Sequence, residues 1–168
     1  MFGKNFKIKA ADILFDTILS DTDHLKTKIV ENNLLNKRLF LRNNFPYLSY
    51  IYHLHIYEDL LRSKYNQKSV SDVIMYCIDK MANQPTSNQV LERKKILLEA
   101  YNMVLEDKRE AVSFDAFIFS MVFALFEGQI EVVLATDGES VKSLIDCFLN
   151  HFKQIRTSSK IMQMDLGL

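Results

Sequence analysis

The stretch Ser113-Phe-Asp-Ala-Phe-Ile-Phe-Ser-Met-Val-Phe-Ala-Leu-Phe126 decides the fold that we expect for this chain. It has the length of a helix and carries apolar side chains on nearly every side of the helix cylinder, which a soluble protein tolerates only at its centre. Burial of each phenylalanine contributes roughly 1.5–3 kcal/mol. The stretch therefore predicts a buried central helix surrounded by other helices. Five phenylalanines should lie in the core: Phe114, Phe117, Phe119, Phe123 and Phe126.

The length and composition of the chain predict a single all-α domain. Its 168 residues include four Gly and two Pro, too few for the tight turns of a sandwich or barrel. Apolar residues recur at helical spacing in six or seven segments. We expect a globular bundle of six or seven helices over residues 1–156 and a C-terminal tail over 157–168. Ile130 to Ala135 and Phe6 to Ala10 are candidates for one or two very short strands.

Polar residue pairs with the spacing of a capping box predict where several helices begin. The pairs are Ser20 with Asp23, Ser69 with Asp72, Thr86 with Gln89, and Thr136 with Glu139. The first pair predicts that an N-terminal helix ends near Ser20 and that a second helix starts there. Pro46 suits the start of a helix because its missing N–H group is not needed at the first helical position. Ser113 is expected to begin the Phe-rich helix.

The residue pattern predicts a cytoplasmic protein without a membrane span. The first residues are basic and contain no apolar core of a secretory signal. The longest apolar run, Ala116 to Phe126, is shorter than the roughly 18–20 residues that cross a bilayer. Cys77 and Cys147 both lie in helical patterns, which favours reduced thiols over a disulfide.

The segment from Tyr47 to Tyr57 has the most unusual composition in the chain, with four tyrosines and two histidines. On a helix, His53 and His55 point about 200° apart, so they cannot bind one metal ion together. His55 shares a face with three other polar residues: Tyr52, Glu58 and Asp59. That face is either half of a metal or acid–base site or a solvated edge. Because no second ligand helix is visible, we favour the solvated edge.

A second stripe of the same segment carries Tyr47, Tyr50 and Tyr57 between leucines. Tyrosine combines an apolar ring with a polar hydroxyl, so the stripe suits either the edge of the core or an exposed recognition face. The pattern favours the core edge with wetted hydroxyls and leaves the recognition face as the alternative.

Cys147 and His151 lie four residues apart in the last helical pattern, so their side chains can touch. This spacing suits a thiolate–imidazolium nucleophile or half of a zinc site. Neither site is complete. A zinc site needs further ligands, and Cys77 is the only other thiol. A cysteine nucleophile needs a third group to orient the histidine, for which Asn150 and Asp146 are the nearest candidates. No nucleotide-binding, EF-hand or nucleophile-elbow motif occurs either. We expect a buried thiol beside a surface histidine, and no metal or cofactor.

Charge is unevenly distributed, although 21 basic residues balance 21 acidic ones. Residues 106–146 contain nine acidic and three basic residues, a net charge of −6, so the remainder carries +6. A bipolar protein can steer a charged partner onto one end, although charge blocks are usually only solvated surface. The consecutive Arg93, Lys94 and Lys95 have acidic neighbours and no interleaved aromatic residues, so we expect no nucleic-acid binding.

These observations favour a non-catalytic protein that binds another protein, with a basic partner expected. A small inhibitor, such as an immunity protein against a toxin, is the specific form that we expect. The expected partner-binding residues are Tyr47, Tyr50, Tyr52, His55, Tyr57, Glu127, Glu131, Asp137 and Glu139. Two alternatives stay open: a carrier with an apolar cavity between helices for a small molecule or lipid, and a thiol or metal-dependent enzyme that uses Cys147 and His151. The sequence also leaves homo-oligomer formation open.

Overall fold

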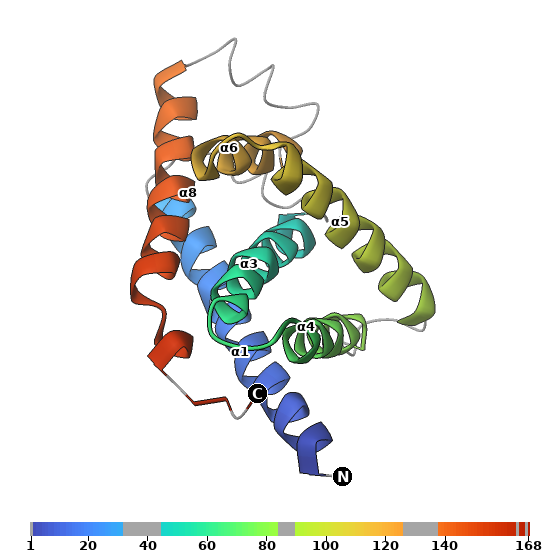
Figure 1. The fold of residues 1–168 in the computed structure, drawn as a ribbon. Helices are drawn as coiled ribbons and strands as arrows, with labels where there is room; N and C mark the ends of the chain where they lie inside the picture. Colours follow the sequence, from blue (N-terminus) through green and yellow to red (C-terminus); the bar gives the residue numbers. More distant parts are fainter. Residues whose placement is uncertain (1, 32–44, 84–89, 126–137, 164, 167) are drawn as a thin grey trace.

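Six α-helices and one short 3₁₀-helix make up the described part of the chain (Figure 1). The computed structural model describes residues 2–31, 45–83, 90–125, 138–163, 165–166 and 168. In chain order the elements are α1 (Phe2–Glu31), α3 (Phe45–Arg62), α4 (Gln67–Ala82), α5 (Val90–Glu110), α6 (Phe114–Leu125), α8 (Gly138–Ser158) and η1 (Lys160–Gln163). This architecture confirms the all-α bundle.

Neither predicted strand is found in the described part of the chain. Phe6 to Ala10 lies inside α1, where Ala10 is buried, so the prediction of a strand there was wrong. Ile130 to Ala135 lies outside the described residues. None of the described helices is long and apolar enough to cross a bilayer.

Helix α1 runs for 30 residues without the break that was predicted near Ser20. A single apolar stripe continues across that position, and its members are fully buried: Leu14, Ile18, Leu25 and Ile29. Their spacing of four, seven and four residues keeps them on one side of an uninterrupted helix. Ser20 and Asp23 are exposed on the other side. Packing of the stripe against the bundle therefore outweighs the local tendency of Ser20 to cap a new helix.

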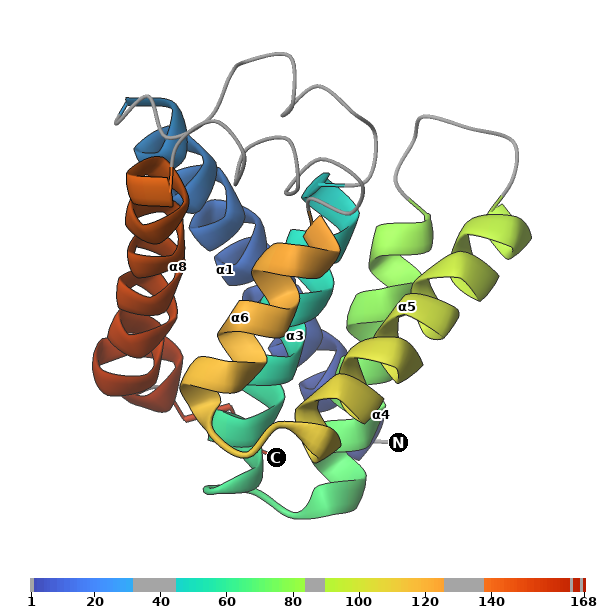
Figure 2. The same ribbon diagram turned by 90° about the horizontal axis from the view of Figure 1, so that it is seen from above.

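Helix α3 occupies the centre of the bundle, where it packs against α1, α4, α5, α6 and α8 (Figure 2). Its side chains are buried on every side of the cylinder from Ser49 to Tyr57. This is the position that the sequence predicted for the Phe-rich helix. Tyrosine and histidine can fill it because, once buried, many of their polar atoms find partners on the surrounding helices.

The Phe-rich helix α6 packs against α3, α5 and α8, and its described side chains, from Phe114 to Val122, are buried on one side only. Phe117 is 3% exposed, whereas Phe119 is 42% exposed. The expectation that all five phenylalanines lie in the core is therefore wrong for Phe119, and Phe114 is half-buried. The side chains of Phe123 and Phe126 lie outside the described residues.

Two helix starts can be compared with the predicted caps. Ser113 Oγ accepts a hydrogen bond from the Ala116 N–H at 3.1 Å, as expected for the residue that precedes α6. Helix α4 starts before Ser69, because Asn66 Oδ1 accepts a bond from the Ser69 N–H at 2.9 Å and caps the helix. The predicted caps at Thr86 and Thr136 lie outside the described residues.

The C-terminal tail is docked on the bundle. Helix α8 continues to Ser158, and η1 follows after one residue. Ile161 and Leu166 are buried, and the Leu166 N–H donates a hydrogen bond to the Tyr65 hydroxyl at 3.1 Å. The tail is thereby held against the bundle, and η1 becomes one wall of the cleft described next.

Candidate functional site

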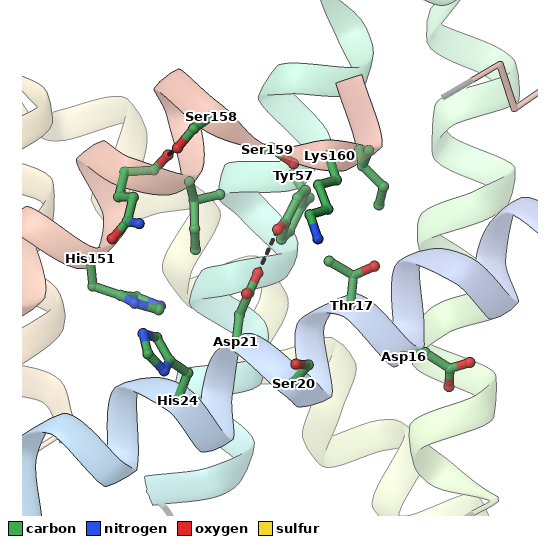
Figure 3. Close-up of a pocket in the computed structure, with 13 residues that line it drawn as sticks. Asp16, Thr17, Ser20, Asp21, His24, Tyr57, His151, Ser158, Ser159 and Lys160 are labelled. Atoms are coloured by element: carbon green, nitrogen blue, oxygen red, sulfur yellow. Dashed lines mark hydrogen bonds between the residues drawn. The ribbon is translucent and has the colours of Figure 1, made fainter. Parts of the chain in front are cut away.

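A cleft of about 550 Å³ lies between α1, the C-terminal half of α8 and η1, with α3 behind it (Figure 3). This volume lies within the range of small-ligand sites, roughly 300–1,000 Å³. Eleven of its thirteen lining residues carry a polar group, namely Asp16, Thr17, Ser20, Asp21, His24, Tyr57, His151, Gln154, Ser158, Ser159 and Lys160, and the other two are Ile155 and Ile161.

Helical periodicity explains why these residues face one another. On α1 the lining residues Thr17, Ser20, Asp21 and His24 are spaced by three or four, so they form one stripe. On α8 the lining residues His151, Gln154, Ile155 and Ser158 follow the same spacing. Because α1 packs against α8, the two stripes form opposite walls.

Asp21 and Tyr57 form the shortest contact in the cleft. The Tyr57 hydroxyl donates to Asp21 Oδ2 at 2.5 Å (Figure 3). Burial raises the pKa of Asp21, an effect that the hydrogen bond from Tyr57 and the nearby His24 only partly offset. Burial and the adjacent carboxylate also raise the pKa of Tyr57, so its hydroxyl stays protonated and remains the donor.

Three of the four histidines form a row of contacts from the cleft into the core. The ring of exposed His24 lies 6.2 Å from that of His151. His151 Nε2 lies 2.8 Å from His53 Nε2, and His53 Nδ1 lies 2.7 Å from the carbonyl oxygen of Ser49. Burial lowers the pKa of His53 to about 4 and, together with nearby charges, the pKa of His151 to about 2. Both rings are therefore neutral at pH 7.

These bonds assign the tautomers of the two neutral rings. The carbonyl of Ser49 can only accept, so the proton of His53 is on Nδ1 and its Nε2 is an acceptor. His151 must then donate its Nε2–H to His53. The remaining nitrogen of His151, Nδ1, is an acceptor, and no described residue donates to it. His151 is also one of the residues that line the cleft.

Cys147 and His151 do not form an activated pair. Burial raises the pKa of the half-buried Cys147 thiol, whereas the pKa of His151 is lowered. A thiolate–imidazolium pair requires the opposite shifts. His151 is 3% exposed, so the expected surface histidine is in fact buried. Among the described residues, no group of three or more His, Cys, Asp or Glu could hold a metal ion.

Three residues of the expected solvated edge, Tyr52, His55 and Glu58, are buried, and only Asp59 is exposed. His55 Nε2 donates to the carbonyl oxygen of Tyr101 at 2.9 Å, and the two rings stack with centroids 4.3 Å apart. Burial lowers the pKa of His55 to about 4. Glu58 beside it is 3% exposed and accepts bonds from Arg62 and the Tyr101 hydroxyl. His55 and Glu58 are buried because Tyr101 on α5 forms the hydrogen bonds that were expected to be made with water.

The predicted partner-binding residues are spread over several environments. Tyr50, Tyr52, Tyr57 and His55 are at most 2% exposed, so they form no exposed recognition face in this structure. Glu139 is exposed in the first turn of α8. The remaining side chains lie outside the described residues: Tyr47, Glu127, Glu131 and Asp137. Partner binding by this set stays a prediction.

The cleft brings together residues that sequence reasoning did not select, above all Asp21, His24 and Lys160. A signal was present in the polar stripe of α1, which continues at helical spacing through the predicted break at Ser20. Comparisons with protein-family models, with curated proteins and with solved structures each gave no match to the chain.

Proposed function

We propose that this protein is a non-catalytic binding module for another protein and that the cleft between α1 and α8 is its recognition site. The observation that carries the proposal is the convergence of charged and polar side chains on one cleft of about 550 Å³. A groove of this size can take a side chain or a short segment of a partner, and such pockets are where binding energy concentrates in protein interfaces.

Binding is favoured over catalysis by the way the cleft histidines are used. His151 donates its only proton to His53, and His24 contacts it through its ring. In the described part of the chain, neither cleft histidine is bonded to a Ser, Thr or Cys side chain that it could activate as a nucleophile. The thiol of Cys147 has a raised pKa, which makes it a poor nucleophile.

A basic partner suits the cleft because Asp16 and Asp21 lie on its α1 wall. No described residue forms an ion pair with either carboxylate. A small inhibitor or immunity protein remains the specific form of this proposal. In that form the acidic residues Glu127, Glu131, Asp137 and Glu139 would add to the attraction, and binding would weaken with salt.

Site-specific photocrosslinking tests the proposal. A photoreactive phenylalanine derivative replaces Gln154 at the cleft or, as a matched control, Asn102 on the exposed side of α5, and cells that naturally make the protein are irradiated. We expect one basic protein to be linked at position 154 and not at 102. Crosslinks at 102 alone, or at neither position, would contradict the proposal. Native mass spectrometry of the purified protein then tests the carrier alternative, which predicts the mass of the protein with a bound small molecule.

A further inference from the structure

The cleft contains hydrogen-bond acceptors that the described residues leave without a donor. Asp21 accepts one bond, from Tyr57 to Oδ2, and its other oxygen has no described partner. His151 Nδ1 is an acceptor because its proton is on Nε2. His24 lies next to both groups, since its ring contacts His151 and its charge acts on Asp21. Asp21, His24 and His151 lie at the same end of the cleft (Figure 3).

A ligand at this end must therefore bring donors and a positive charge. Asp21 is partly buried and forms no ion pair with a described residue, so a cation placed beside it would be screened less than at an open surface. A guanidinium group has five N–H donors in a planar fork and can bond a carboxylate and a second acceptor together. A metal ion fits less well, because the described residues hold no cluster of three or more ligands.

We infer that this end of the cleft, at Asp21 and His151, binds a cationic side chain, arginine or lysine, which the partner protein inserts. The inference rests on the proposed function and adds the chemistry that the cleft selects. Arginine is the better match because its planar guanidinium group has five donors and can bond more than one acceptor, whereas the lysine ammonium group is a compact point charge.

Lys160 adds a positive charge to the same cleft. Figure 3 shows its side chain extending from η1 toward Thr17, and no described residue forms an ion pair with it. Lys160 does not form a salt bridge with Asp21, which lies in the same cleft. Lys160 opposes a bound cation at long range and can donate to a carbonyl or carboxylate group of the partner beside the inserted side chain.

The test is a titration of the isolated protein with Nα-acetyl-arginine amide at pH 8, followed by NMR of the histidine ring C–H signals. The control probe is Nα-acetyl-citrulline amide, which has nearly the same shape and no charge. We expect the arginine probe to shift the signals of His24 and His151 and to bind at least about tenfold more tightly than citrulline. Equal shifts with both probes would overturn the inference.

Variants locate the bound probe. Asp21→Asn keeps an acceptor for Tyr57 but removes the charge, and it should weaken arginine binding about tenfold. Asp72→Asn on α4, where Asp72 pairs with Lys7, is the matched control and should change nothing. If Asp21→Asn fails to fold, Gln154→Lys places a cation at the exposed cleft wall and should weaken binding instead. Arginine binding that survives both Asp21→Asn and Gln154→Lys would overturn the inference.

The Lys160→Gln variant tests whether the cleft binds the cationic group of the probe or its carbonyl groups. Lys160→Gln should strengthen arginine binding about twofold, because a weak repulsion that solvent screens is lost. Weaker binding would mean that the probe is held through its carbonyl groups, and the inference would be wrong. A protein linked at position 154 without arginine binding would overturn this inference alone. Arginine binding without a linked protein would instead count against the proposed function.

Discussion

Two polar clusters lie on different sides of helix α3. They differ in whether both oxygens of the carboxylate accept hydrogen bonds from described residues of the protein. In the first, which we call the α5 cluster, Glu58 accepts from Arg62 on one oxygen and from Tyr101 on the other. In the second, the cleft cluster of Asp21, Tyr57, His24 and His151, Asp21 accepts a described bond on one oxygen only.

The number of bonded oxygens distinguishes a buried carboxylate with a structural role from one with a role in ligand binding. A carboxylate whose two oxygens are occupied stabilises the packing of its own helices, and removal leaves its partners without acceptors. A carboxylate that keeps one oxygen toward a cleft contributes less to packing and can bond a ligand. The α5 cluster should therefore respond to mutation through stability, and the cleft cluster through binding.

The largest expected effect is a loss of stability at acidic pH, to which His151 of the cleft cluster, His53 bonded to it, and His55 stacked on Tyr101 of the α5 cluster contribute. The pKa values of His53, His55 and His151 are lowered in the folded state to about 4, 4 and 2, so below pH 6.5 the unfolded chain binds more protons. Stability is complete above pH 6.5 and decreases as the pH falls. Between pH 7 and pH 5 we expect each histidine to cost about 2 kcal/mol.

Urea denaturation at pH 8, 7, 6 and 5 measures this loss. Lys28 and His24 add to it, because their charges disfavour protonation of His151 in the folded state. Asp21 has the opposite effect on stability. Because its pKa is raised, the folded state binds a proton more readily than the unfolded chain, and this favours folding as the pH falls. His24→Gln is the control: it removes an exposed ring, and most of the loss should remain. A free energy of unfolding that is unchanged from pH 7 to 5 would contradict the neutral, buried assignment of the three rings.

The next largest effect should come from Glu58→Ala in the α5 cluster. The change removes the acceptor of the Tyr101 hydroxyl and the partner of Arg62 in a site where Glu58 is almost fully buried. We expect a loss of about 3 kcal/mol in the free energy of unfolding. Asp59→Ala is the matched control, because Asp59 is an exposed neighbour that pairs with Lys108, and it should cost less than about 1 kcal/mol. Equal losses for both variants would remove the distinction between the two carboxylates.

Hydrophobic periodicity predicted the fold class because burial of one helix face is a local property of the sequence. It did not identify α3 as the central helix, since hydropathy counts tyrosine and histidine as partly polar. Their suitability for the core depends on acceptors that other helices supply, such as the carbonyl of Tyr101 for His55. The predicted break near Ser20 failed for a related reason: the continuous packing of α1 is visible only when its neighbours are in place.

The cleft was still less accessible to sequence reasoning. His24 and His151 are 127 positions apart, and the pairing of their rings depends on how α1 and α8 pack. The spacing of Cys147 and His151 suggested a local pair, but His151 bonds to His53 on α3 instead. Spacing along one helix shows which residues share a face, whereas the partner of that face comes from the tertiary structure.

A smaller effect is expected at Cys147, close to the cleft cluster. Its thiol is half-buried with a raised pKa, so alkylation by iodoacetamide at pH 7.5 should be at least about tenfold slower than that of a free cysteine. Cys77 is buried, and burial raises its pKa to about 12, so it should react more slowly still. Mass spectrometry of the labelled protein measures both rates. Reaction of Cys147 faster than free cysteine would revive the thiol-enzyme alternative.

The smallest effect on stability should come from Asp21→Asn in the cleft cluster. The asparagine carbonyl can still accept from the Tyr57 hydroxyl, and loss of a partly buried charge removes its desolvation cost. We expect the free energy of unfolding at pH 7 to change by less than about 1 kcal/mol, a fraction of the loss for Glu58→Ala. Urea denaturation of both variants side by side gives the comparison. A loss at Asp21 as large as that at Glu58 would mean that the cleft carboxylate is structural too, and the reason for assigning it to a ligand would disappear.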